Sequence, residues 1–317
     1  MTIGIAGAGS IGVAMALVFA RAGHDVRCWD PFPDACRRGA NELGDRLALL
    51  HRGGLLDEDP GVVAARVAFV SELDLAVDDV QLVQECAPER LDVKQALYER
   101  LAGLTGPTVP LASSSSALRA SLIADGNPAA HRILVAHPVN PPYLLPVIEL
   151  VPSALTDPAI TERAASVYAG AGLRPVALHR EVEGFVFNRL QGAVLREAYC
   201  LVRDGVVDVA ELDAVVTLGL GRRWSVVGPF ETVDLNTRGG IESHAEKMGP
   251  AYERMGRERG QHDPWTPDLV AAVAAQRREL LPLADWERRV AWRDEQLIER
   301  ARADVHDHPR AGEVAVG

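Results

Sequence analysis

His137 and Glu149 are the residues of this chain whose types and spacing most directly suggest proton-transfer chemistry. His137 ends the mostly apolar run at 132–136, and Glu149 lies 12 residues later inside the run at 147–151. If the two runs form neighbouring strands, a His–Glu hydrogen bond fixes the imidazole tautomer and stabilises the protonated ring, which makes a general base. The alternative is that His137 only caps a strand while Glu149 faces solvent at a sheet edge. Periodicity alone leaves both interpretations open.

A glycine-rich loop near the start of the chain suggests a second kind of chemistry, the binding of phosphates. Residues 7–12 read Gly-Ala-Gly-Ser-Ile-Gly, between a predicted strand and a predicted helix, as in the dinucleotide-binding GxGxxG motif. In that setting Gly7 permits the tight turn, Gly9 lets a pyrophosphate approach the backbone, and Gly12 lets helix and strand pack closely. The alternative is a plain turn between a strand and a helix.

Asp30 supplies the acid that a dinucleotide-binding loop requires. It lies 18 positions after Gly12, at the end of the second predicted strand. A carboxylate at this point accepts hydrogen bonds from the ribose hydroxyls and repels a 2′-phosphate. The expected cofactor is therefore NAD rather than NADP.

The elements that must position these residues alternate between strands and helices in the first part of the chain. Strand-like runs occur at 3–6, 24–29, 67–70, 82–85, 109–113, 133–136, 147–151 and 175–178, and helical segments at 11–21, 91–104 and 160–169. Alternation of this kind predicts a mostly parallel sheet. After residue 184 helical stretches dominate, at 186–203, 209–218, 267–280 and 284–303.

These patterns predict an α/β protein with a Rossmann-type, doubly wound and mostly parallel sheet, followed by an all-α domain. The NAD-binding domain, with the His–Glu pair, is expected over residues 1–183. The helical domain for substrate binding and dimerisation is expected over 184–303. Residues 304–317 mix charge, Pro and Gly without apolar periodicity, which indicates a loose tail.

The composition argues against several classes of partner. Lys plus Arg number 33 against 44 Asp plus Glu, a net charge of −11 that repels nucleic acids and anionic membranes. The four cysteines have no metal-ligand spacing, so we expect no metal site and a reducing cytoplasm. The uncharged stretch 2–20 lacks the basic start of a signal peptide and contains four glycines, so we interpret it as a strand and a helix.

Further motifs occur in order between residue 3 and residue 260. They read Gln-Glu-Cys-Ala-Pro-Glu at 84–89, four serines at 113–116, Ala-His-Pro-Val-Asn-Pro-Pro-Tyr at 136–143, Val-Ile-Glu-Leu-Val-Pro at 147–152, Gly-Phe-Val-Phe-Asn-Arg-Leu at 184–190, and Gly-Leu-Gly-Arg-Arg-Trp at 219–224 with Gly-Pro at 228–229. Through these motifs and their order, the chain resembles the 3-hydroxyacyl-CoA dehydrogenase superfamily. Its His-Pro-Val-Asn-Pro-Pro segment, in place of the His-Phe-Phe-Asn-Pro of the acyl-CoA enzymes, is similar to the lambda-crystallin or L-gulonate 3-dehydrogenase branch.

The resemblance implies roles for individual residues. The catalytic set would be His137 as base, Glu149 as its orienting acid, Ser116 for the substrate hydroxyl, and Asn188 for the substrate. The cofactor set would be Gly7, Gly9, Gly12 and Asp30, with Glu89, Lys94 and Asn140 near the ribose and nicotinamide. Two alternatives stay open: Ser115 could take the place of Ser116, and Glu89 with Lys94 could be a solvated helix face.

The resemblance also implies an enzyme that oxidises the secondary alcohol of a small, L-gulonate-like 3-hydroxy acid to the 3-oxo acid with NAD. Arg222 and Arg223 are candidates for the substrate carboxylate, or else surface charges at a helix end. The alternatives are a 3-hydroxyacyl-CoA or carnitine-type dehydrogenase, and an NAD-binding, crystallin-like protein without enzymatic activity. We expect a homodimer, because the later helices carry apolar residues on more faces than one small domain buries.

Overall fold

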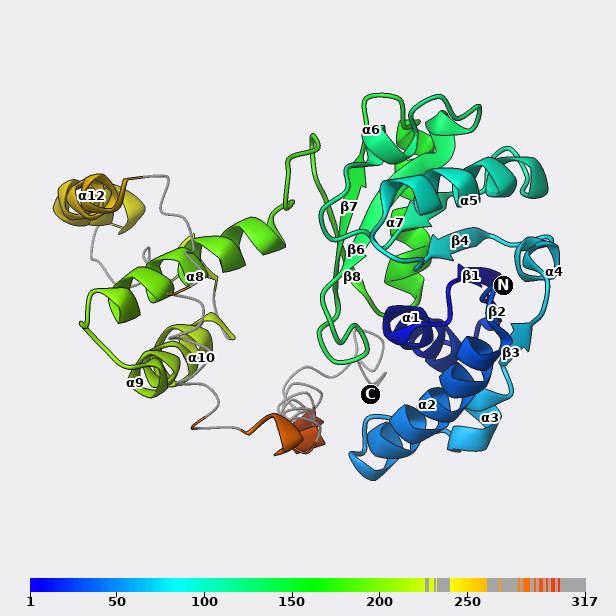
Figure 1. Cartoon of the computed structure of the whole chain (residues 1–317), viewed down its shortest axis with the longest axis horizontal. Helices are drawn as coiled ribbons and strands as arrows, with labels where there is room; N and C mark the ends of the chain where they lie inside the picture. The colour runs from blue at the N-terminus through cyan, green and yellow to red at the C-terminus, as the bar shows by residue number, and fades with distance from the viewer. Residues whose placement is uncertain are drawn as a thin grey trace, which may run out of the picture. The chain divides into compact units, whose positions relative to one another are not determined.

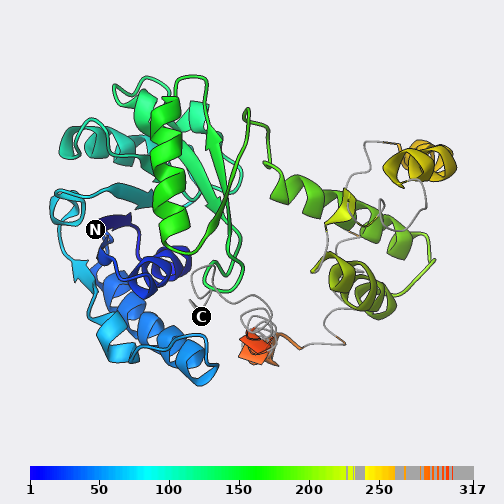
Figure 2. The same ribbon diagram turned by 180° about the vertical axis from the view of Figure 1, so that it is seen from behind.

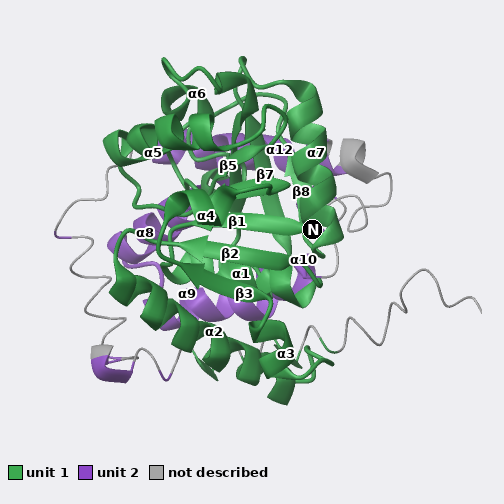
Figure 3. Ribbon diagram, turned by 90° about the vertical axis from the view of Figure 1, so that its right-hand side faces the viewer, with its two compact units in different colours: residues 1–189, 291–317 green, residues 190–290 purple. Residues whose placement is uncertain are grey.

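The computed structural model of the chain consists of two compact units (Figure 3). It describes residues 1–225, 228–230, 232, 240–260, 268, 279, 282–285, 288, 291–292, 295, 298–299 and 302. Unit 1 comprises residues 1–189 and 291–317, and unit 2 comprises residues 190–290. The end of the predicted helical domain, from residue 291, thus groups with the N-terminal unit. The predicted tail at 304–317 and nearly all of the predicted helix at 267–280 lie outside the described residues.

Unit 1 is built on an eight-stranded sheet in the order β3-β2-β1-β4-β5-β6-β7-β8. Neighbouring strands are parallel except β6 and β7, which are antiparallel. The mostly parallel sheet that the sequence predicts is therefore confirmed. The strands are β1 Thr2–Ala6, β2 Asp25–Trp29, β3 Val67–Val70, β4 Leu82–Glu85, β5 Leu111–Ser113, β6 Ile133–Pro138, β7 Val147–Pro152 and β8 Arg174–Ala177.

Helices cover both faces of this sheet (Figures 1 and 2). One face packs against α1 Ser10–Arg21, α2 Pro33–Arg52, α3 Pro60–Ala64 and α7 Pro158–Gly170. The other face packs against α4 Leu73–Val77, α5 Leu91–Leu104 and α6 Ala120–Ile123. Alternate residues of β6 point into the two cores, Leu134 and Ala136 into one and Ile133 and Val135 into the other. Burial on both sides explains why the strands are continuous apolar runs.

Helix α2 is absent from the sequence-based expectations. Its 20 residues are mostly polar, and its buried positions Ala35, Gly39, Leu43, Leu47 and Leu50 follow the three-to-four-residue spacing of a narrow apolar stripe. The many charges between them mask this spacing in the sequence.

A C-terminal segment of the chain returns to the end of α2. Ile298 is buried in the unit 1 core, and a Cβ placed on Gly53 would lie 2.5 Å from its Cγ2 atom. Arg302 donates a hydrogen bond to the carbonyl of Arg52 over 3.1 Å. Only a glycine at position 53 leaves room for this packing.

Unit 2 is helical in its described part. Its elements are α8 Phe187–Arg203, which begins at the end of unit 1, α9 Val209–Ala214, a π-helical turn Val215–Leu220, α10 Gly221–Trp224, α12 Gly240–Arg259 and a 3-10 turn Leu283–Asp285. The α-helical part of the predicted helix at 209–218 thus ends at residue 214, and π-helical geometry follows from 215 to 220.

The three glycines of the loop between β1 and α1 differ in how much space a side chain would find there. Gly7 has a φ of +120°, and a Cβ there would lie 2.6 Å from the carbonyl oxygen of Cys86. A Cβ on Gly12 would lie 1.9 Å from the carbonyl oxygen of Gly7. A Cβ on Gly9 would meet no heavy atom within 4 Å. Gly7 and Gly12 are therefore required by the fold, whereas Gly9 leaves open space beside the loop.

This contrast predicts the stabilities of two matched variants. Gly12→Ala should lower the free energy of unfolding by about 3 kcal/mol or more, because its methyl group overlaps backbone that cannot move aside. Gly9→Ala should change it by less than about 1 kcal/mol, since the methyl meets open space in a conformation that alanine adopts. Urea denaturation measures both, and equal stability of the two variants would contradict this account of the loop.

Candidate active site

The antiparallel pairing of β6 and β7 brings His137 and Glu149 face to face. The two residues are register partners in the ladder. His137 Nδ1 lies 2.8 Å from Glu149 Oε2, and the two side chains are 7% and 3% exposed. Glu149 therefore does not face solvent at a sheet edge, and of the two interpretations that the spacing left open, the structure has the hydrogen-bonded pair.

The second carboxylate oxygen of Glu149 bonds to the chain at the start of α8. Its Oε1 atom accepts the backbone N–H of Val186 over 2.7 Å and that of Phe187 over 2.9 Å. Burial raises the pKa of Glu149, but hydrogen bonds from His137, Phe187 and Val186 lower it by more. The pKa therefore lies below its ordinary value of 4.5. Glu149 is thus an anion at neutral pH, with both oxygens engaged.

Two aromatic rings flank the imidazole of His137. The Phe185 ring is fully buried, with its centroid 5.5 Å from that of His137. The Phe187 ring meets the imidazole edge-on, with centroids 6.4 Å apart. Phe185 has a φ of +51°, a conformation that is unfavourable for a bulky side chain and that surrounding structure must hold in place. Phe185 belongs to the motif at 184–190, but nothing in the sequence pattern indicated its contact with His137.

The four serines after β5 have different environments. The hydroxyl of Ser113 donates to Glu85 Oε2 over 2.6 Å, that of Ser114 to the Glu85 carbonyl over 2.8 Å, and that of Ser115 to Glu89 Oε1 over 2.6 Å. Ser116 is the exposed member of the run. Asn188 Nδ2 donates to the Ser116 carbonyl over 2.8 Å. The structure thus brings Ser116 and Asn188 together, and it exposes Ser116 while Ser115 is buried and its hydroxyl is engaged.

The residues expected to hold NAD fit that cofactor at its phosphate and ribose ends. Asp30 Oδ2 accepts the N–H of Ala8 in the glycine loop over 2.9 Å, and its Oδ1 accepts the N–H of Phe32 over 3.0 Å. This bonding places the acid at the loop, next to the open space beside Gly9. The arrangement suits a pyrophosphate at the start of α1 with a ribose against the acid.

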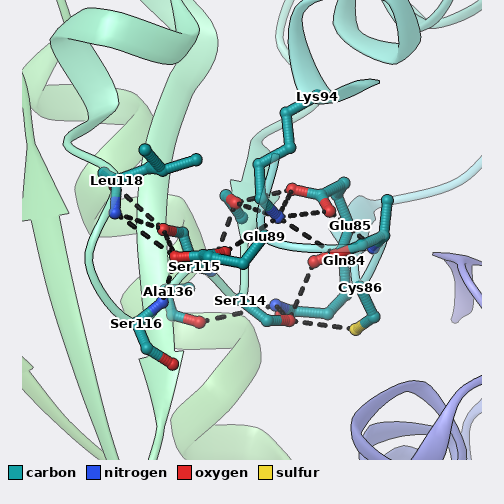
Figure 4. A network of polar contacts seen from close by, with 12 residues as sticks. Gln84, Glu85, Cys86, Glu89, Lys94, Ser114, Ser115, Ser116, Leu118 and Ala136 are labelled. Atoms are coloured by element: carbon teal, nitrogen blue, oxygen red, sulfur yellow. Dashed lines mark hydrogen bonds and ion pairs between the residues drawn. The ribbon is translucent and has the colours of Figure 1, made fainter. Parts of the chain in front are cut away.

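The other expected cofactor residues have different surroundings. Asn140 is exposed in the loop after β6. Glu89 is bonded to the turn of residues 115–118. Lys94 is 1% exposed, and its Nζ atom lies 2.7 Å and 3.0 Å from the two carboxylate oxygens of Glu85 (Figure 4). Lys94 is therefore a buried ion-pair residue rather than part of a solvated helix face.

Arg222 and Arg223 lie on α10 in unit 2, and both are exposed. Within the described part of the chain, no group of three or more His, Cys, Asp or Glu side chains is placed to hold a metal ion. Among the same residues, no helix combines the length and apolar character needed to cross a bilayer.

Comparisons with known proteins identify the family of the chain. Residues 2–182 match the model for the NAD binding domain of 3-hydroxyacyl-CoA dehydrogenase, and residues 184–285 match the model for its C-terminal domain. The chain is 36% identical over 308 residues to the lambda-crystallin homolog of Bos taurus, covering 95% of this chain and 94% of the relative. It is 38% identical over 314 residues to the L-carnitine dehydrogenase of Streptomyces griseus, covering 98% and 91%.

A solved structure is similar over nearly the whole chain. The 5-dehydrogenase of 5-formyl-3-hydroxy-2-methylpyridine 4-carboxylic acid, an NAD+ dependent dismutase, aligns with a TM-score of 0.82 at 27% identity, covering 95% of this chain and 97% of that structure. The family follows from two findings: the two family models together span most of the chain, and relatives match it above 30% identity along its length. The chain belongs to the 3-hydroxyacyl-CoA dehydrogenase family of NAD-binding oxidoreductases.

Proposed function

We propose that this protein oxidises the secondary alcohol of a small, L-gulonate-like 3-hydroxy acid to the 3-oxo acid with NAD. The observation that carries the proposal is the buried 2.8 Å contact between His137 Nδ1 and Glu149 Oε2. A hydrogen bond from Nδ1 to the carboxylate leaves Nε2 of the neutral ring as the proton acceptor. His137 is then the general base, and Glu149 fixes its tautomer.

In this mechanism the substrate alcohol gives up a proton and a hydride. His137 takes the hydroxyl proton at Nε2, and the anionic Glu149 stabilises the imidazolium that results. Bound NAD supplies the acceptor for the hydride. Ser116 holds the substrate oxygen and Asn188 lies beside it, bonded to the Ser116 carbonyl. Gly7, Gly9, Gly12 and Asp30 would hold the cofactor, and Asn140 would serve its nicotinamide end.

Two relatives bear on the substrate. L-carnitine, on which the Streptomyces griseus relative acts, is itself a small 3-hydroxy acid. Arg222 and Arg223 would serve the carboxylate of such a substrate. A carnitine-type or 3-hydroxyacyl-CoA dehydrogenase remains the second candidate, favoured by the carnitine relative and by the family assignment. A crystallin-like NAD-binding role is the third, favoured by the lambda-crystallin homolog.

A substrate panel with one variant separates these candidates. We expect the fastest NADH formation with L-gulonate, whereas a faster reaction of carnitine or of 3-hydroxybutyryl-CoA would favour the second candidate. His137→Gln should lower kcat by about 10²–10⁴-fold, the usual contribution of a general base, while NAD binding stays unchanged. Near-normal turnover of this variant would show that the base is misassigned. Absence of activity on gulonate, 3-hydroxybutyrate, carnitine and 3-hydroxybutyryl-CoA would favour the crystallin-like role.

A single variant tests the part played by Glu149. The pKa of Glu149 is lowered, so its carboxylate is charged at neutral pH. Glu149→Gln removes the charge that stabilises the imidazolium formed in the reaction, and kcat should fall by about tenfold or more. An unchanged kcat would argue against electrostatic coupling of the pair.

We also propose that the protein is a homodimer formed through unit 2. Its described helices expose large apolar side chains, among them Leu190, Val194, Val215, Leu218 and Met255. Apolar surface of this extent on a helical unit is typical of an interface.

Light scattering at micromolar concentration should give twice the mass of one chain. Leu218→Lys, at a side chain that is 71% exposed, should shift the protein toward monomer. The same change at Val62, an exposed apolar residue of unit 1, should leave the mass unaltered. A monomeric wild-type protein would contradict the proposal.

A further inference from the structure

A single carboxylate oxygen holds the turn that carries Ser116. Glu89 Oε1 accepts the Ser115 hydroxyl over 2.6 Å. It also accepts the backbone N–H groups of Ser116, Ala117 and Leu118 over 3.0, 3.0 and 3.3 Å (Figure 4). Three successive N–H groups aimed at one point form an anion-binding nest. Here the nest is filled by the chain's own carboxylate.

The electrostatic surroundings keep Glu89 charged. Burial raises the pKa of Glu89, but the Ser115 hydroxyl, the backbone N–H groups of the turn and the Lys94 ammonium lower it below its ordinary value. Lys94 Nζ lies 3.6 Å from Glu89 Oε2, and it is itself fixed by Glu85. The ammonium therefore supports a carboxylate that in turn supports the serine turn.

Both backbone polar groups of Ser116 are held by side chains from other parts of unit 1. Its N–H donates to Glu89, from the segment between β4 and α5. Its carbonyl accepts from Asn188, at the start of α8. Ser115 next to it is buried, and its hydroxyl both donates to Glu89 and accepts the N–H of Leu118 over 2.7 Å. These two hydrogen bonds fix the backbone of Ser116 and therefore the position of its Cβ atom.

We propose that Glu89 is a positioning residue that acts through Ser116, in addition to the cofactor contact that the family resemblance implies. Lys94 keeps the Glu89 carboxylate in the nest. The inference rests on the proposed function, because the position of Ser116 affects turnover only if its hydroxyl binds the substrate. A misplaced hydroxyl of this kind lowers the rate of the chemical step and leaves cofactor binding intact.

Kinetics and cofactor titration measure the two roles of Glu89 separately. Glu89→Ala should lower kcat at saturating NAD by about 10- to 100-fold on the best substrate of the panel. The Kd for NADH, measured by fluorescence, reports the contact of Glu89 with the cofactor. Asp30→Ala is the reference for a cofactor ligand and should weaken NADH binding. Asp92→Asn is the matched control, because Asp92 lies near Glu89 in sequence and its side chain pairs with Arg90. It should alter neither quantity.

Two further measurements test whether Glu89 acts through Ser116. Glu89→Ala should have no added effect on kcat in a Ser116→Ala background, since the residue it positions is then absent. Formate, an anion small enough to enter the nest, should restore part of kcat to Glu89→Ala but none to Ser116→Ala. Additive losses in the double variant, or NADH binding weakened by tenfold or more with kcat unchanged, would overturn the proposal.

Amide hydrogen exchange separates failure of this inference from failure of the proposed function. Exchange at residues 116–118 should be slow in the wild type, fast in Glu89→Ala and slow in Asp92→Asn. Unchanged exchange in Glu89→Ala would show that Glu89 does not hold the turn, whatever the substrate is. If the wild type oxidises none of the panel compounds, the proposed function fails, and the exchange result still decides whether Glu89 holds the turn.

Discussion

A buried carboxylate must have its charge and both its oxygens satisfied, and Glu149 imposes this requirement on three elements at once. One oxygen bonds to His137 on β6 and the other to two N–H groups at the start of α8. A slip of β7 by one residue would turn Glu149 to the opposite face of the sheet and leave a buried charge without partners. The register of β6 with β7, the orientation of the imidazole and the entry of the chain into α8 therefore depend on one another.

The rest of the candidate site gathers at the carboxyl edge of the parallel strands. Gly7 follows β1, Asp30 follows β2, Glu89 follows β4 and Ser116 follows β5. The strand order reverses between β1 and β4, because the chain adds β2 and β3 on one side of β1 before it returns to the other. Open α/β sheets bind their ligands at such a point. Because β7 is antiparallel, Glu149 near its start lies beside His137 near the end of β6. In a parallel arrangement the start of β7 would lie at the amino edge of the sheet instead.

Sequence patterns predicted the central strands of unit 1 because these are buried on both faces and so form apolar runs that charged loops interrupt. They drew attention to His137 and Glu149, polar residues in otherwise apolar strands, but could not decide whether the two pair, because that depends on which strands are neighbours. Helix α2 escaped prediction because its apolar stripe is narrow. The contact of Glu89 with the serine turn, 27 residues away for Ser116, has no local signature. The positive φ of Phe185 could not be predicted either, because tertiary packing rather than residue type imposes it.

The return of the chain to α2 bears on the order in which the protein can mature during synthesis. Ile298 fills the hollow that Gly53 leaves at the end of α2, and Arg302 caps the carbonyl of Arg52. Every described strand of unit 1 precedes Ile298 in the chain, so the apolar surface at the end of α2 stays uncovered until synthesis has passed that residue. A chain that stops before Ile298 would expose this surface on the nucleotide-binding unit.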